Sequence, residues 1–327
     1  MSSDQDNTIK QHFPDIPATP AMAILYEDAS AQRLVALRSQ RRSCSALIGL
    51  LADDSTTVLA QVRSELTRLG RIARPALLRG TRNEQPRVRS RARQILLQAG
   101  RRHALARLVS YSMRRSHELE TALSLLDSFS WPETDFRPYR RALDAMGDEV
   151  RKRMHRRRPG LRQGLALAEY LGGELGFSGP SDDHHHPDNI SLAHTIERKR
   201  GLPLTLCAIY TAVAKRAGIQ AHLLPFPGHV LLRIEHEGER AIVDPFGGGR
   251  VLTERKCLSY LASHGLPYRA KWFKPASDTA MFARQVGNLL ICHRAARRFG
   301  LARTLGRVLD CLEQGRPDLR RDLRRIR

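Results

Sequence analysis

Paired cysteines and long apolar runs are both missing from this chain of 327 residues. The five cysteines stand singly, without a Cys-x-x-Cys pair, which disfavours a disulfide framework and a zinc ribbon. No apolar run approaches the roughly 20 residues that span a bilayer, and the N-terminus MSSDQDNTIKQHFPDIP has no apolar signal segment. We therefore expect a soluble, cytoplasmic protein without a membrane partner.

Lysine is also scarce, since it occupies only seven positions and leaves arginine to supply most of the formal net charge of +22. Fifteen arginines lie from Arg63 to Arg115 against two glutamates, whereas eight basic residues balance eight acidic ones from Ser181 to Arg250. Clustered arginines bind phosphate, but charge runs are usually solvated surface. Nucleic-acid binding by the arginine-rich helices and a purely compositional skew are the two explanations.

Apolar residues recur at helical spacing in the segments on both sides of a neutral centre. We predict an α+β fold in which helical N-terminal and C-terminal segments surround a buried helix packed on an antiparallel sheet. A spacing at Val58 recurs loosely at Val88, which is typical of HEAT-like helices or of an ordinary bundle. The expected segments are a leader with one short helix (1–40), HEAT-like or bundle helices (41–110), a helical block (111–180), the core (181–265) and C-terminal helices (266–327).

The centre of the chain reads as two helices that lead into a sheet. Asn189 is a plausible N-cap of a short helix that ends at Gly201. Pro203 suits the first turn of the next helix, PLTLCAIYTAVAKRA, and Gly218 marks its end. Three predicted strands follow, IQAHLLPF, HVLLRIEH and ERAIVDPF.

The segment GLPLTLCAIYTAVAKRAGIQAHLLPFPGHVLLRI…AIVDPFGGGR resembles a transglutaminase-like core. In that superfamily a cysteine opens the buried helix, a histidine opens the next strand and an aspartate ends the third strand. These roles fall on Pro203, His229 and Asp244, so the cysteine is absent from its place. The runs RKRGLPLTL, FPGH, DPFGGG and PDLRRD are similar to the bacterial SirB family and its F-box-protein relatives, which also carry Gly-x-Pro at the helix start.

The resemblance implies a catalytic triad without its nucleophile. A thiol at a helix N-terminus is activated by the helix dipole and a neighbouring imidazolium, while histidine moves the proton and aspartate orients it. Pro203 supplies no nucleophile. Cys207 is the tentative substitute, but it lies about 6 Å deeper along the helix axis, where we expect a structural thiol in the core.

His229 and Asp244 are the residual triad positions, and two roles fit them. They form either a structural hydrogen-bonded pair or a site that still binds a ligand or transfers a proton. Asn189, Pro203 and Phe246 are the candidate binding residues around them.

No metal or cofactor is predicted. The adjacent residues His184, His185 and His186 cannot all face one ion, and no H-E-x-x-H motif accompanies them. The glycine run 247–249 is not followed by the Gly-Lys pattern of a phosphate loop.

Three functions follow from these residues. The favoured one is a noncatalytic transglutaminase-like module that binds a protein or peptide. The first alternative is an amide hydrolase or acyl transferase that uses His229 and Asp244 with water or Cys207. The second alternative is nucleic-acid binding through the arginine-rich helices.

Overall fold

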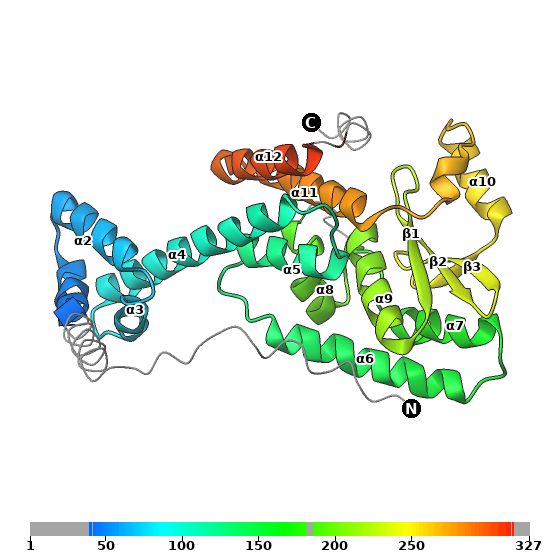
Figure 1. Ribbon diagram of the computed structural model, residues 1–327, viewed down its shortest axis with the longest axis horizontal. Coiled ribbons are helices and arrows are strands. Elements are labelled where there is room, and N and C mark those ends of the chain that lie inside the picture. The colour runs from blue at the N-terminus through cyan, green and yellow to red at the C-terminus, as the bar shows by residue number, and fades with distance from the viewer. Residues whose placement is uncertain (1–38, 41, 182–185, 315, 317–327) are drawn as a thin grey trace, which may run out of the picture. The chain divides into compact units, whose positions relative to one another are not determined.

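The computed structural model describes residues 39–40, 42–181, 186–314 and 316, and the chain divides into two units, 1–99 and 100–327 (Figure 1). The leader helix expected near residues 21–37, the PDLRRD run and two of the three adjacent histidines lie outside the described residues. Within the described part, none of the helices combines the length and apolarity that crossing a bilayer requires. The finer division into five segments stays a prediction.

The first unit is helical, with elements η1 (Leu50–Ala52), α2 (Thr56–Leu69), α3 (Arg74–Gly80) and the beginning of α4 (Pro86–Ser112). Ser55 caps α2 because its hydroxyl accepts the N–H of Val58, and Gly70 ends the helix at a positive φ of 51°. The first unit has its own apolar core, which includes Val62 and Ile95. A HEAT-like arrangement of these helices stays a prediction.

The second unit contains the remainder of α4 and a four-stranded antiparallel sheet in the order β1-β2-β3-β4 (Figure 1). Its helices are α5 (Leu119–Ser130), α6 (Arg137–His155), α7 (Leu161–Ala168), α8 (Leu192–Arg198), α9 (Pro203–Ala217), α10 (Glu254–Ser263), α11 (Asp278–Ala295) and α12 (Phe299–Glu313). Its strands are β1 (Gln220–Leu224), β2 (Leu231–His236), β3 (Glu239–Asp244) and β4 (Arg250–Leu252). The predicted α+β class and the three predicted strands are confirmed, and the short strand β4 is additional.

The sheet is apolar on both faces. Leu232 pairs in register with Leu223 and Val243, and all three pack into the large helical core on one face. Leu231 and Leu224 pair on the other face, in a smaller core that α10 covers. Because successive side chains of a strand point to opposite faces, the strands contribute apolar side chains to a core on each face of the sheet.

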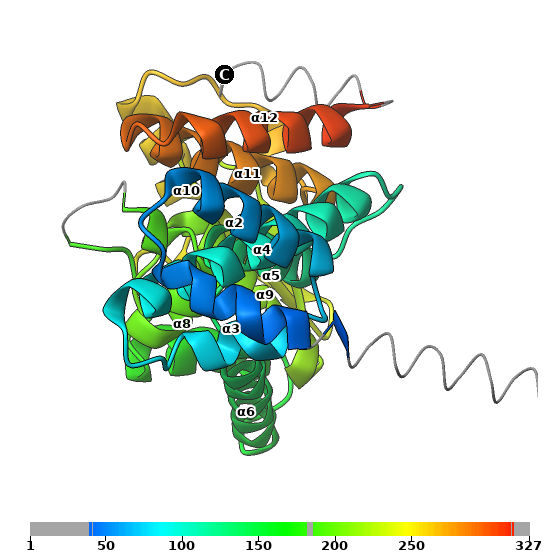
Figure 2. The same cartoon turned by 90° about the vertical axis from the view of Figure 1, so that its left-hand side faces the viewer.

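The buried helix that the sequence predicts is α9, and it packs on the sheet. Its residues Leu206, Ile209, Tyr210 and Val213 have no exposed surface. Two further helices, α11 and α12, lie along each other in both views of the molecule (Figure 1, Figure 2). The core of the second unit therefore extends from the sheet through α9 to the C-terminal helices.

The N-cap of α8 is Ser191, which corrects the expectation that Asn189 holds this position. The Ser191 hydroxyl accepts the N–H of His194 at 3.2 Å and donates to Asp127 of α5 at 2.9 Å. The same carboxyl oxygen of Asp127 accepts the N–H of Ala193 at 3.1 Å. Burial raises the pKa of Asp127 to about 7, although these hydrogen bonds oppose the shift. The helix therefore begins where two side chains satisfy its first N–H groups.

Asn189 has a different structural role. It ends a separate 3-10 turn, Pro187–Asn189, and is buried. Its side-chain oxygen accepts a hydrogen bond from Arg198 at 3.2 Å, and its carbonyl accepts the N–H of Leu202 at 2.8 Å. Because Leu202 is the N-cap of α9, Asn189 supports the start of that helix.

The glycine turn after β3 approaches a π-helical turn, Glu169–Glu174, which continues α7. A Cβ atom on Gly172 would lie only 2.1 Å from the carbonyl oxygen of Gly248, whereas a Cβ on Gly173 would have nothing within 4 Å. Only glycine at position 172 permits this backbone contact. The contact holds in place the loop that follows Asp244.

We predict that Gly172→Ala lowers the free energy of unfolding by about 1–3 kcal/mol, because the carbonyl of Gly248 cannot move without the loop. The measurement is urea unfolding followed by circular dichroism. Gly173→Ala is the matched control, with an expected change of at most about 1 kcal/mol. Equal losses in the two variants would contradict the packing argument.

Candidate functional site

His229 and Asp244 meet at one end of the sheet. His229 precedes β2, and Asp244 is the last residue of β3, which pairs with β2 antiparallel. The two side chains are hydrogen-bonded, with 2.9 Å between His229 Nε2 and Asp244 Oδ1. Their side chains are 17% and 13% exposed, so this pair borders solvent instead of lying wholly in the core.

The Asp244 carboxylate is held in its charged form. Burial raises its pKa, but the hydrogen bond and charge of His229, the N–H of Gly247 and the charge of Arg250 outweigh burial and leave the pKa below its ordinary value. An ionised carboxylate that accepts from Nε2 fixes the orientation of the imidazole. The other ring nitrogen of His229 has no hydrogen-bond partner among the described residues.

Phe246 forms one wall beside the imidazole. Its ring meets the ring of His229 edge-on, with 5.5 Å between centroids and an interplanar angle of 89°. The carbonyl of Phe246 accepts the N–H of Gly179 at 2.9 Å, and a Cβ on Gly179 would lie 2.3 Å from the aromatic ring. The aromatic ring therefore packs directly on the backbone of the segment before α8 and restrains the imidazole.

Helix α9 contacts the residue that precedes β2, but its first turn carries no nucleophile. Pro203 is the first helical residue. One turn later, Cys207 has no exposed surface, and its thiol donates to the carbonyl of Val230, the residue after His229, at 3.3 Å. Burial first, and then the charge of Asp244, raise the pKa of the Cys207 thiol well above its ordinary value. Cys207 lies in the core, as its helical position predicts, and a thiolate is disfavoured there.

Arg284 of α11 is a residue at this site that no sequence motif revealed. Its Nη2 donates to the carbonyl of His229 at 3.2 Å. Burial lowers the pKa of this guanidinium. The one signal in the sequence is a lone arginine in the run MFARQVGNLL, whose other residues are mostly buried.

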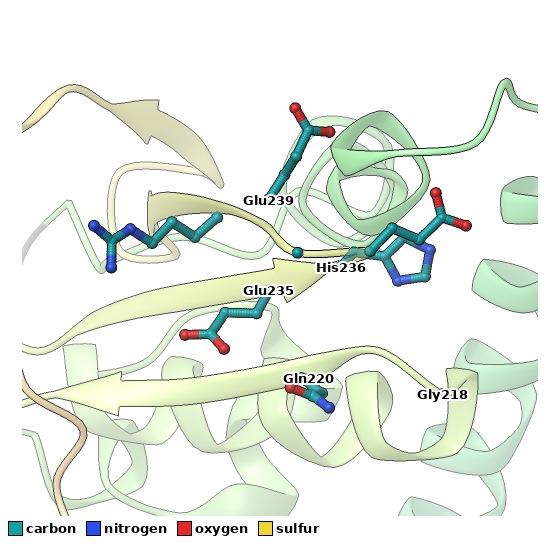
Figure 3. A pocket seen from close by; sticks show the side chains of 8 residues that line it. Gly218, Gln220, Glu235, His236 and Glu239 are labelled. Atoms are coloured by element: carbon teal, nitrogen blue, oxygen red, sulfur yellow. The ribbon is translucent and has the colours of Figure 1, made fainter.

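A separate hollow of about 730 Å³ lies at the opposite end of the strands, lined by Gly218, Gln220 and residues 235–240 (Figure 3). The side chains of Glu235 and Glu239 point in different directions in Figure 3. Within the described ranges, no three or more His, Cys, Asp or Glu side chains are grouped to hold a metal ion. Neither hydrogen-bonded acid–base pair nor convergent ligands mark this hollow, so the candidate site is at His229.

Comparison with known proteins finds relatives of the same region of the chain. A family model described as "Transglutaminase-like superfamily" matches residues 137–287. A UPF0162 protein of Xylella fastidiosa is 32% identical over 164 residues, which are 48% of this chain and 58% of that protein. F-box only protein 21 of Homo sapiens is 26% identical over 156 residues, which are 45% of this chain and 24% of that protein.

The matched region covers less than two thirds of the length of either relative. No solved structure matches the chain significantly. The family model includes α6 to α9, the whole sheet and most of α11, and with them His229, Asp244 and Arg284. Residues 137–287 therefore match a transglutaminase-like domain, and the UPF0162 and F-box only protein relatives support the SirB-type family within that superfamily.

Proposed function

We propose that this domain binds a protein or peptide segment at the His229–Asp244 pair without forming a covalent intermediate. The observation that carries the proposal is an oriented, partly exposed imidazole beside a helix start that offers proline in place of a thiol. Cys207, the one cysteine of α9, is fully buried and donates its thiol hydrogen to a backbone carbonyl. Acyl transfer through a cysteine needs an accessible thiolate near the histidine.

The relatives add support for a partner protein. One of them is named an F-box only protein, which favours a protein-binding role for the domain that it has in common with this chain. The wall of Phe246 beside His229 supplies an aromatic surface of the kind that often anchors protein interfaces.

The enzymatic alternative uses the same pair. A histidine oriented by a carboxylate is able to activate water for amide hydrolysis, although without a covalent nucleophile the acceleration is smaller. The two proposals differ in a measurable way, because only the enzyme releases a product.

For the binding proposal, we expect purified full-length protein to select peptides from a random library and to bind them about tenfold more weakly in the variant His229→Ala. Fluorescence anisotropy measures the affinity. His236→Ala is the matched control, since His236 ends the same strand and bonds Gln163 at 3.0 Å, away from the site. Ammonia release from glutamine peptides, or peptide cleavage, that disappears in His229→Ala would establish the enzyme instead.

For Cys207, we predict resistance to iodoacetamide in the native protein, because the thiol is buried and its pKa is raised. Cys311 is the internal reference, since it is the one cysteine of the five that is not buried. Mass spectrometry after brief labelling should find Cys311 modified first. Faster labelling of Cys207, abolished in His229→Ala, would restore it as a displaced nucleophile.

Nucleic-acid binding is the second candidate function, and a specific surface favours it. The basic ridge, defined here as Arg102 and Arg107 of α4 with Arg303 and Arg307 of α12, is exposed. None of these four arginines forms an ion pair with a carboxylate in the part of the chain that the structure describes. By contrast, the arginines of α6 and α9 are mostly neutralised, as in Arg151 with Asp148 at 2.8 Å and Arg216 with Glu120 at 2.7 Å.

The four arginines of the basic ridge all lie in the second unit, and the C-terminal ends of their two helices are joined by a hydrogen bond. Arg316, just after α12, donates to the carbonyl of Arg114, just after α4. Arg298, the N-cap of α12, and Arg101 of α4 both lie near His293 of α11. Burial and then the charges of these two arginines lower the pKa of His293 to about 4. Both helices therefore carry exposed arginines without a carboxylate partner, and such guanidinium groups are suited to a phosphate backbone.

We predict that the double variant Arg303→Glu, Arg307→Glu binds a labelled duplex about tenfold or more weakly near 100 mM salt and lowers the slope of log affinity against log salt by about 2. Anisotropy titrations at several salt concentrations measure both. Arg137→Glu with Arg141→Glu is the control, because these exposed arginines have the same spacing on α6. Equal losses in both double variants, or salt-independent binding, would exclude the basic ridge as a phosphate surface.

A further inference from the structure

Arg284 is a largely buried cation without an anionic partner. A guanidinium carries five N–H donors. Among the described residues, one hydrogen bond uses them, from Nη2 to the carbonyl of His229 at 3.2 Å. Burying an unpaired charge is unfavourable, so such a residue needs a reason beyond packing.

The hydrogen bond to His229 does not supply that reason. A carbonyl also accepts hydrogen bonds from neutral donors, so holding the start of β2 does not by itself require a buried charge. The hydrogen bond to His229 therefore does not explain why the side chain at position 284 is charged.

Asp244, the carboxylate of the site, already has other partners. Asp244 accepts from His229 at 2.9 Å and also interacts with the N–H of Gly247 and the charge of Arg250. The site therefore combines one satisfied carboxylate with two guanidinium groups and an imidazole. Its balance of charge favours an incoming anion.

Access to the guanidinium is retained. The side chain of Arg284 is partly exposed, like those of His229 and Asp244. The backbone contact with His229 places Arg284 at the same end of the sheet as the imidazole. A planar guanidinium offers two parallel N–H groups, which match the two oxygens of a carboxylate.

We propose that Arg284 binds a carboxylate group of the ligand that occupies the His229 site. The inference rests on the proposed function and specifies its ligand class, a peptide segment with an acidic side chain or a free C-terminus. Arg284 anchors the charge, and the imidazole and Phe246 contact the adjoining part of the ligand.

The first experiment uses the full chain and two small probes of equal shape, N-acetylglutamate and N-acetylglutamine, at constant ionic strength. Nuclear magnetic resonance of the histidine rings reports on the site. We expect N-acetylglutamate to shift the His229 signals in a saturable way and N-acetylglutamine to leave them unchanged. Because this comparison uses the unaltered protein, it decides the matter even where a variant fails to fold.

The second experiment compares variants. Arg284→Gln should weaken N-acetylglutamate binding about tenfold or more, and Arg284→Lys should retain part of it because the charge remains while the planar fork is lost. Arg137→Gln, which removes an arginine whose side chain is 86% exposed, should leave the affinity unchanged. An equal loss in Arg137→Gln would show that general attraction by the net positive charge explains the binding.

Peptides distinguish the two sources of the carboxylate. Selected peptides are compared with a free or an amidated C-terminus, and with internal glutamate or glutamine. Loss of binding on amidation identifies a C-terminus, and loss on the change to glutamine identifies a side chain. Peptides that bind in a His229-dependent way but ignore both changes would overturn the role of Arg284 and leave the proposed function intact, whereas absence of any peptide binding would overturn both.

Discussion

The antiparallel pairing of β2 with β3 is the constraint on which the site depends. Leu232 lies opposite Val243, and this register brings His229, two residues before β2, to Asp244, the last residue of β3. A slip of one residue would turn Leu232 and Val243 away from the helical core, so burial of these side chains stabilises the register. The 2.9 Å hydrogen bond between His229 and Asp244 is a consequence of that apolar pairing.

The resemblance to the transglutaminase-like superfamily assigns the histidine and aspartate roles to this pair, and it assigns the nucleophile position to a proline. Pro203 suits the first turn of α9 because a residue at that position has no intrahelical acceptor for an N–H, which proline lacks. Cys207 faces the core one turn later, where burial disfavours the thiolate. What remains at the surface is an oriented imidazole, an aromatic wall and a guanidinium without an anion. These groups are the basis of the proposed binding role.

The arginine excess is not uniform in its surroundings. On α6 and α9, arginines meet carboxylates, as Arg216 meets Glu120 and Asp144. On α4 and α12, exposed arginines of the basic ridge have no such partners within the described residues. Base composition alone explains a high arginine content, but it does not explain why the arginines of the basic ridge form no ion pair with a carboxylate while most of those on α6 and α9 do. That difference is the reason for testing phosphate binding by these arginines.

Much of the core could be predicted from the amino-acid order. Apolar spacing predicted the buried α9, strand patterns predicted β1 to β3, and the motif resemblance assigned His229 and Asp244 to one site. These features are local or repeat at fixed intervals, so they are visible in one sequence. The start of α8 was predicted wrongly at Asn189, because the cap at Ser191 depends on Asp127, 64 residues away in the chain.

Arg284 shows the limit most clearly. Nothing near it in the sequence marks a site, since its partner is a backbone carbonyl 55 residues earlier. Likewise, the sequence shows how many arginines the chain has, but it does not show which of them form an ion pair with a carboxylate. By itself, the sequence determined which segments are buried and which residue types are available for chemistry. Only the tertiary structure decided which charges are paired, because ion pairs and carbonyl contacts join residues that are distant along the chain.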